Sequence, residues 1–148
     1  MNKKESLLTL ENLIQIINQK LIPYLAEKEV NFVYLGGSWA TRTNSWWSDI
    51  DIFISHTHAD NLSKNVYFYW LLELNTQATL LSGLDSISVQ VLEKLPLHVQ
   101  YDVIKNGIVV YEKNKDIRTD FIENLLNQYF DHRIWYERFL NESLGIQE

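Results

Sequence analysis

The sequence has no cysteine, only two prolines and five glycines, and 13 basic residues against 19 acidic ones. The missing cysteines exclude disulfides, thiolate metal sites and thiol catalysis, and they fit a reducing compartment. The net charge of −6 argues against a large nucleic-acid footprint, because binding by counterion release needs a basic surface. We therefore expect no nucleic-acid partner, and a small nucleotide or a protein as the substrate.

Long apolar runs are also missing. No run approaches the length that spans a bilayer, and the first six residues lead into an amphipathic segment instead of a signal-peptide core. There is no repeat, low-complexity segment or Pro/Gly-rich linker. At 148 residues and 46% hydrophobic content, the chain has the size of one compact domain. We expect a single domain over residues 1–148, without membrane contact, in the cytoplasm.

The spacing of apolar residues and turn formers predicts an α/β (α+β) fold with a small mixed sheet flanked by helices. An amphipathic helix is expected over residues 6–22, with Pro23 kinking or interrupting it. Asp60 is a possible N-cap of the second long helix, and Gly83 lies near its end. The other expected helices are 60–81, 96–107 and 116–144, and the expected strands are 31–35, 49–55, 86–92 and 108–112.

Two glycines end the first predicted strand. The apolar run from Val30 to Leu35 reads as a buried strand, and Gly36 and Gly37 follow it. Backbone N–H groups of glycines can approach a phosphate without interference from a Cβ atom. Gly36, Gly37 and Ser38 are therefore candidate nucleotide-binding residues, with Ser38 on the triphosphate.

Two aspartates begin the next predicted strand, and ten residues separate Asp49 from the Gly37-Ser38 pair. The alternating stretch from Asp49 to Ile54 puts Asp49 and Asp51 on one side of a strand, with Cα atoms about 6.6 Å apart. Carboxylates at this spacing can converge on one or two Mg²⁺ ions that bridge phosphates. The pattern predicts a metal-dependent nucleotidyl transfer site with Asp49 and Asp51 as catalytic metal ligands.

The order Gly-Ser, about ten residues, Asp-x-Asp resembles the minimal nucleotidyltransferases of the polymerase-β-like superfamily. The resemblance covers most of the chain, because residues 95–112 are similar to the family's helix-to-strand segment and residues 118–131 to its final helix. It implies a polymerase-β-like nucleotidyltransferase fold that uses Mg²⁺ and ATP. Many members are antitoxins that transfer AMP to a tyrosine of a HEPN-domain ribonuclease toxin, which makes such a toxin the expected partner. The HEPN signature itself, Arg followed four to six residues later by His, is absent from this chain.

The sequence departs from this family at two places. The resemblance implies a third carboxylate about eight residues before Pro96, and Ser88 stands there. A serine hydroxyl is a weak, uncharged Mg²⁺ ligand. Asp85 is the nearest substitute, but three residues away it faces the other side of a regular strand. In the loop, Arg42 keeps a positive charge where family members often have several, and it is either a phosphate contact or a plain surface arginine.

Aromatic and histidine residues surround the predicted metal strand. The five tryptophans of the chain predict an exposed apolar patch for a partner. Trp46 and Trp47, directly before the strand, can pack under the loop, contact a partner or stack on adenine. His56 and His58 lack a third zinc ligand of fitting spacing, so we expect solvated loop histidines.

Three functions fit the sequence. The first is an antitoxin-type nucleotidyltransferase, that is, a protein adenylyltransferase acting on its toxin. The second is a catalytically degenerate antitoxin that neutralises its toxin by direct binding, which the loss of the third carboxylate favours. The third is a stand-alone transferase that modifies a small molecule, for which the chain lacks a dedicated acceptor domain.

Overall fold

A computed structural model describes residues 8–45, 47–58 and 61–144. The helices are α2 (Leu10–Ile16), α3 (Ile22–Glu27), α4 (Gly37–Ala40), α5 (Lys64–Ser82), α6 (Leu97–Asn106) and α7 (Lys115–Leu144), and the strands are β1 (Val30–Gly36), β2 (Ile50–His56), β3 (Ile87–Val91) and β4 (Ile108–Glu112). A π-helical turn, η1 (Ile17–Leu21), joins α2 to α3, and a 3-10 turn, η3 (Leu92–Lys94), follows β3.

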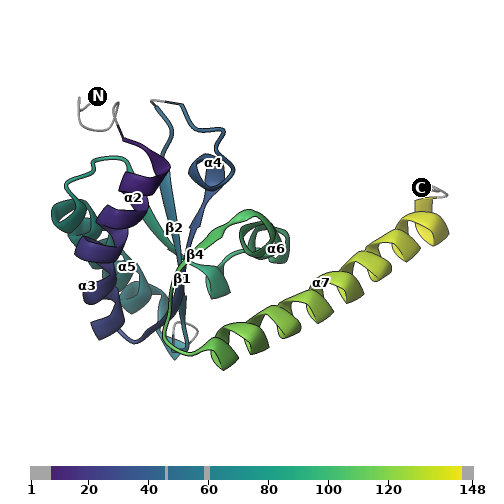
Figure 1. The fold of residues 1–148 in the computed structure, drawn as a ribbon. Coiled ribbons are helices and arrows are strands. Elements are labelled where there is room, and N and C mark those ends of the chain that lie inside the picture. Colours follow the sequence, from purple (N-terminus) through teal and green to yellow (C-terminus); the bar gives the residue numbers. More distant parts are fainter. Residues whose placement is uncertain (1–7, 46, 59–60, 145–148) are drawn as a thin grey trace.

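The four strands form one sheet in the order β3-β2-β1-β4, and the small mixed sheet expected from the sequence is confirmed. β1 runs antiparallel to both β2 and β4, whereas β2 and β3 are parallel. A parallel pair needs a crossover connection, and α5 supplies it between β2 and β3. The fold is thus α+β, with its helices on both faces of the sheet (Figure 1).

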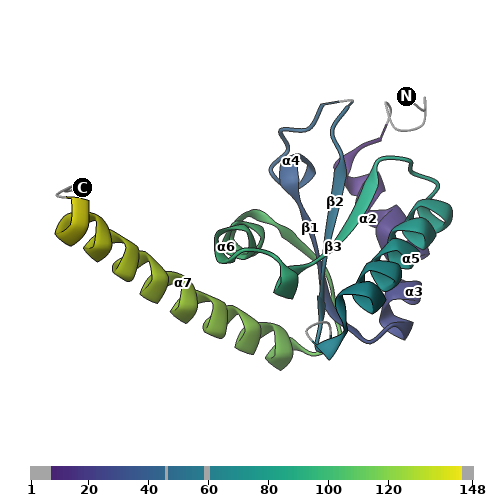
Figure 2. The ribbon, with the colours of Figure 1, turned by 180° about the vertical axis from the view of Figure 1, so that it is seen from behind.

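The two faces of the sheet are covered differently. Helices α2, α3 and α5 pack on one face over an aliphatic core that includes Val33, Ile52 and Val89 (Figure 2). The other face carries the aromatic residues Phe32 and Phe53 and is covered by α6 and the first part of α7. The loop that contains α4 stands at the end of the sheet opposite the start of α7 (Figure 1).

The second half of α7 projects away from the sheet as an arm (Figures 1 and 2). Phe121 and Leu125, in the first half of α7, pack against the body of the protein. Beyond them Phe130, Ile134 and Trp135 are exposed, Trp135 by 61%. An arm of this kind leaves apolar surface in contact with water.

Three helix boundaries differ from the sequence-based prediction. Helix α2 begins at Leu10, with Thr9 as its N-cap, and not at residue 6. The first helix does not end at residue 22, because η1 winds more widely there and α3 continues to Glu27. Pro23 lies in the first turn of α3, where its missing N–H is tolerated. The start of α5 was also wrong: Ser63 caps it by accepting from the Val66 N–H at 3.4 Å. Asp60 lies outside the described residues, while Gly83 ends α5 with φ +73° as expected.

None of the helices traced within residues 8–144 contains an apolar stretch that could cross a membrane.

Candidate nucleotide and metal site

The two glycines at the end of β1 lie directly against β2. Gly36 pairs with Asp51 across the strands, and Gly37 opens α4 with φ +64°. A Cβ atom at Gly36 would collide with the Phe53 ring, and one at Gly37 with the carboxylate of Asp51. At Gly37 the positive φ and the close approach together favour glycine, whereas at Gly36 only the close approach does. The chain thus places the backbone before Ser38 beside a strand carboxylate.

The two aspartates form a pair of repelling charges. Asp51 lies in β2 and is half-buried, whereas Asp49 is exposed and precedes the strand by one residue. Burial raises the pKa of the Asp51 carboxyl, and the negative charge of Asp49 raises it further. A divalent cation would relieve both effects, and carboxylate oxygens are the ligands that Mg²⁺ prefers. The pair therefore fits Mg²⁺.

The remaining ligands of such an ion would come from phosphate and water. No group of three or more His, Cys, Asp or Glu residues within the described ranges is placed to hold a metal. The register of the parallel pair puts Ser88 of β3 beside Asp51. Asp85 instead lies exposed in the turn before β3. The position next to Asp51 is thus occupied by a hydroxyl, and the assignment of Ser88 to the third-carboxylate position remains a prediction that this register supports.

A cavity of about 230 Å³ opens beside the glycine loop. One wall is the loop itself, with Ser38 and two further hydroxyl side chains, Thr41 and Thr43, whose Oγ1 atoms lie 2.9 Å apart. The opposite wall is α6, which contributes Asp102 and Asn106. These α6 residues were not predicted as site residues, because no sequence pattern connects them to a loop about 64 positions earlier.

Residues 19–116 match the family described as Polymerase beta, Nucleotidyltransferase. The chain belongs to this family. The match spans the glycine loop, both aspartates and the α6 wall of the cavity, so the nucleotidyltransferase fold expected from the resemblance is confirmed.

Solved structures of nucleotidyltransferase-like chains share this fold. A chain in a toxin–antitoxin structure with AMP-PNP is 17% identical, with a TM-score of 0.64 over 93% of this chain and 99% of that one. A chain in the complex of a tri-AMPylated Shewanella oneidensis HEPN toxin with its MNT antitoxin is 15% identical, with a TM-score of 0.61 over 88% and 98% of the two chains. Identities this low establish the fold alone. A search of curated proteins found no match.

Arg42 is directed to α2 in this nucleotidyltransferase. Its Nη2 donates to Glu11 Oε1 at 2.9 Å, and both side chains are about two-thirds exposed. The bond to Arg42 lowers the pKa of the Glu11 carboxyl. Arg42 is not among the residues that line the cavity. An exposed pair of this kind contributes little to stability, so it costs little to break, and a phosphate contact by Arg42 stays a prediction.

Trp39 and Trp47, the described tryptophans before β2, differ in burial. Trp46 lies outside the described residues. The Trp47 side chain is 67% exposed, which rules out packing under the loop for this residue. Trp39, within α4, is instead the tryptophan that is buried against the aliphatic core. Its burial holds α4 against the aliphatic core.

The prediction for His56 was wrong, whereas His58 is exposed as expected. His56 ends β2 with only 7% exposure, and its ring lies 4.8 Å from that of Trp70. Its Nε2 lies 3.1 Å from the Lys28 carbonyl oxygen, and its Nδ1 accepts from the His58 N–H at 3.2 Å. Burial lowers the pKa of His56. The strand simply extends one residue beyond its predicted end.

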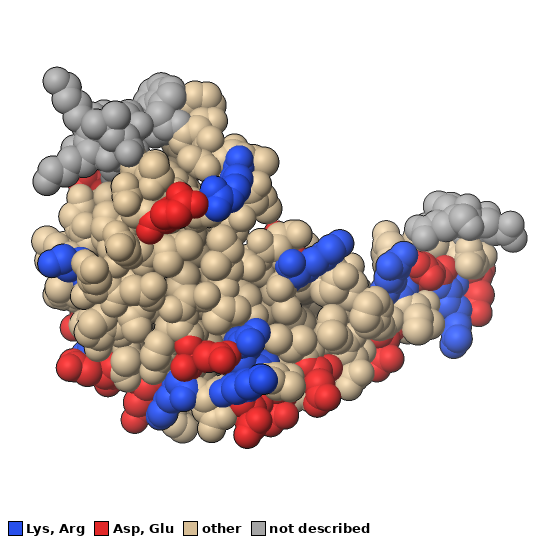
Figure 3. Space-filling view, viewed as in Figure 1, with Lys and Arg blue, Asp and Glu red and all other residues tan. Residues whose placement is uncertain are grey.

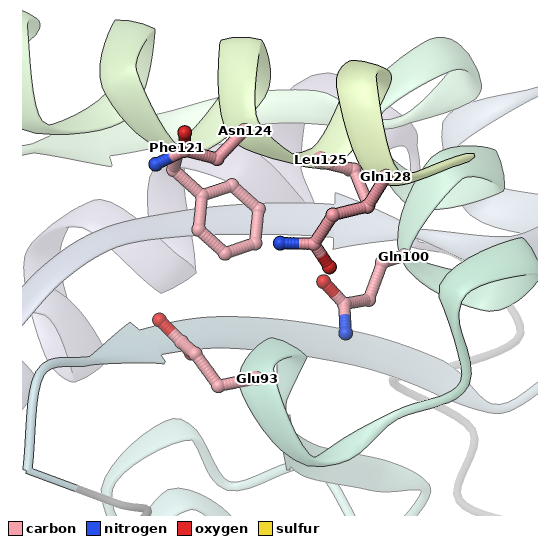
Figure 4. A pocket seen from close by; sticks show the side chains of 6 residues that line it. All are labelled: Glu93, Gln100, Phe121, Asn124, Leu125 and Gln128. Carbon is pink, nitrogen blue, oxygen red and sulfur yellow. The ribbon is translucent and has the colours of Figure 1, made fainter. Parts of the chain in front are cut away.

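A second cavity, of about 290 Å³, lies where α7 meets η3 and α6 (Figure 4). Gln100 and Gln128 point into it from opposite helices, and Phe121 forms one side. Its Glu93 accepts from the Ser55 hydroxyl and, at 3.3 Å, from the His56 N–H. This cavity is larger than the first, but it contains neither the glycine loop nor an aspartate pair, so it is not the candidate active site.

Proposed function

We propose that this protein is an antitoxin that transfers AMP from Mg-ATP to a tyrosine hydroxyl of a HEPN ribonuclease toxin. The observation that carries the proposal is the contact between Gly37 and Asp51, which joins a phosphate-binding turn to a metal-binding carboxylate. Similar chains occur in toxin–antitoxin structures, one with an ATP analogue and one with an AMPylated toxin. We place this activity in the cytoplasm, where ATP is available.

The residues of the chain have separate tasks in this reaction. The backbone N–H groups at Gly37 and Ser38 and the Ser38 hydroxyl bind the triphosphate. Asp49 and Asp51 would hold Mg²⁺, which supplies charge neutralisation on the phosphates. The tyrosine oxygen attacks the α-phosphorus in line, the bond to pyrophosphate breaks, and the phenolic proton leaves to solvent. Positioning of the two reactants is the main contribution of the protein.

A second candidate is an antitoxin that only covers its toxin. The hydroxyl of Ser88 beside Asp51 favours it, because the expected third anion is missing from that position. The exposed aromatic side chains of the arm would suit such a partner as well.

Stoichiometry separates the two candidates. The chain is incubated in substoichiometric amount with its proposed HEPN toxin and Mg-ATP, and the toxin is analysed by mass spectrometry and ribonuclease assay. We expect AMP mass on a tyrosine and loss of ribonuclease activity, both abolished by Asp49→Asn. Protection that appears only at equimolar ratio, without ATP and in the Asp49→Asn variant, would overturn transfer in favour of masking.

A further inference from the structure

We propose that Asp102 recognises the ribose hydroxyls of the nucleotide, an inference that rests on the proposed function. Asp102 lies on α6 and faces the glycine loop across the 230 Å³ cavity. Gly36, Gly37 and Ser38 line the same cavity, so a triphosphate on the loop brings its nucleoside to the mouth of this space. Asp102 thereby becomes a specificity-determining residue outside the metal pair.

The carboxylate of Asp102 is held in place by its own helix. Asn106, one turn further along α6, donates from Nδ2 to Asp102 Oδ1 at 2.7 Å. This bond fixes one carboxylate oxygen, and a carboxylate has further lone pairs with which to accept from a ligand. Asn106 is therefore a positioning residue for Asp102.

The charge of Asp102 decides which part of the nucleotide it faces. A carboxylate repels phosphate oxygens and accepts hydrogen bonds from hydroxyl groups. Asp49 and Asp51, the proposed metal ligands, are not among the residues that line this cavity, whereas Asp102 is, so we place the metal outside it. The sugar of a ribonucleotide offers two neighbouring hydroxyl donors. The geometry therefore assigns Asp102 to the ribose.

The size of the cavity agrees with this assignment. Sites that enclose a whole ligand usually measure about 300–1,000 Å³, and this cavity of about 230 Å³ is smaller. A cavity of this size has room for part of a nucleotide, such as its sugar. On the face drawn in Figure 3, the described Lys and Arg side chains are spread out among acidic ones.

Binding of three probes tests the inference: Mg-ATP, Mg-2′,3′-dideoxy-ATP and Mg-tripolyphosphate, each measured by calorimetry. We expect the wild type to bind ATP at least about tenfold more tightly than dideoxy-ATP, since a hydrogen bond to a charged group is worth that factor or more. Asp102→Ala should lose this preference and leave the affinity for dideoxy-ATP and tripolyphosphate unchanged. Asn106→Ala should reduce the preference partly. Asp120→Ala, an exposed aspartate on α7, is the matched control and should change nothing.

Different outcomes separate this inference from the proposed function. If the wild type binds neither ATP nor tripolyphosphate, the site and this inference both fail. If the wild type binds ATP and transfers AMP while Asp102→Ala keeps the wild-type preference, only the role of Asp102 is wrong. A gain in tripolyphosphate affinity in Asp102→Ala would also overturn it, because Asp102 would then face the phosphates.

Discussion

At the scale of single residues, Asp51 costs the metal-free protein stability. Its pKa is raised above 3.8 in the folded state by burial and by Asp49, so the folded state binds the proton more tightly than the unfolded chain does. The unfolding free energy therefore falls as the pH rises from below 3.8 through the pKa of folded Asp51. Above the pKa of folded Asp51 this loss is complete.

Asp51→Asn should remove that cost. We expect the melting temperature of the metal-free variant at pH 7 to rise above that of the wild type, because the buried charge beside Asp49 is gone. The gain should disappear below pH 3.8, where the carboxyl is protonated in both states. Mg-ATP should stabilise the wild type and not the variant. Thermal melts at both pH values check this, and equal melting temperatures at pH 7 contradict it.

Gly37 is the residue on which the loop geometry depends most. Gly37→Ala introduces a positive-φ alanine and a Cβ atom that collides with the Asp51 carboxylate, whereas Gly83→Ala, at φ +73°, meets nothing within 4 Å. Left-handed backbone costs a non-glycine residue about 1–2 kcal/mol. We expect that loss of unfolding free energy for Gly83→Ala, with unchanged ATP affinity. Gly37→Ala should lose more unfolding free energy than Gly83→Ala and most of its ATP affinity. Denaturant unfolding and calorimetry measure the two quantities. Equal losses in the two variants would show that the collision is absent.

At the scale of elements, the sequence predicts best those segments whose signals are local. The strand at 108–112 and the helix from Pro96 to Gly107 were predicted within one residue, because a helix-starting proline and a terminating glycine frame the latter. The α5 start was missed because Asp60 and Ser63 are equally good N-cap types. Backbone periodicity does not distinguish them.

Contacts between distant elements could not be predicted in the same way. The bond from Arg42 to Glu11 joins segments 31 positions apart, and the approach of Asp102 to the glycine loop depends on how α6 packs on β1. The Asp49–Asp51 pair was found because its spacing is local. The burial of His56 was not predicted, because it depends on packing against Trp70 of α5. The residue pattern of the strand itself carries no information about that contact.

The register of β2 and β3 leads to a prediction about the metal. Ser88→Asp places a third carboxylate beside Asp51. Without metal, this substitution should lower the melting temperature, because like charges repel. It should also lower the Mg²⁺ concentration needed for stabilisation by roughly tenfold, which corresponds to a gain of about 1.4 kcal/mol in the free energy of Mg²⁺ binding. Asp85→Ala is the control and should have little effect. Magnesium titrations followed by thermal melts decide, and the opposite pattern would show that Asp85 occupies the site through a bulge.

At the scale of the whole molecule, the arm is stabilised by its own side chains. Arg133 Nε donates to Glu137 Oε1 at 3.1 Å, and the rings of Trp135 and Phe139 stack 5.7 Å apart. Pairs of this kind contribute only a few tenths of a kcal/mol each, and an isolated helix of this length is marginal in water. Its exposed aromatic side chains are typical of a surface that a partner covers.

Removal of residues 131–148 should therefore separate folding from partner binding. The packed residues Phe121 and Leu125 remain, so we expect a melting temperature within about 4 °C of the wild type and unchanged affinity for Mg-ATP. The affinity of the truncated protein for the HEPN toxin of the proposed function should fall at least about tenfold. The affinity of the Trp135→Ala/Phe139→Ala variant for the toxin should fall as much, because exposed aromatic residues carry much of the energy of an interface. Arg133→Ala/Glu137→Ala removes the ion pair alone and serves as the control, with near wild-type affinity. Pull-down and calorimetry with the toxin measure these affinities. A truncated protein that binds the toxin as tightly as the wild type does would place the interface on the body of the domain instead. The exposed Trp47 would then be the first residue to test.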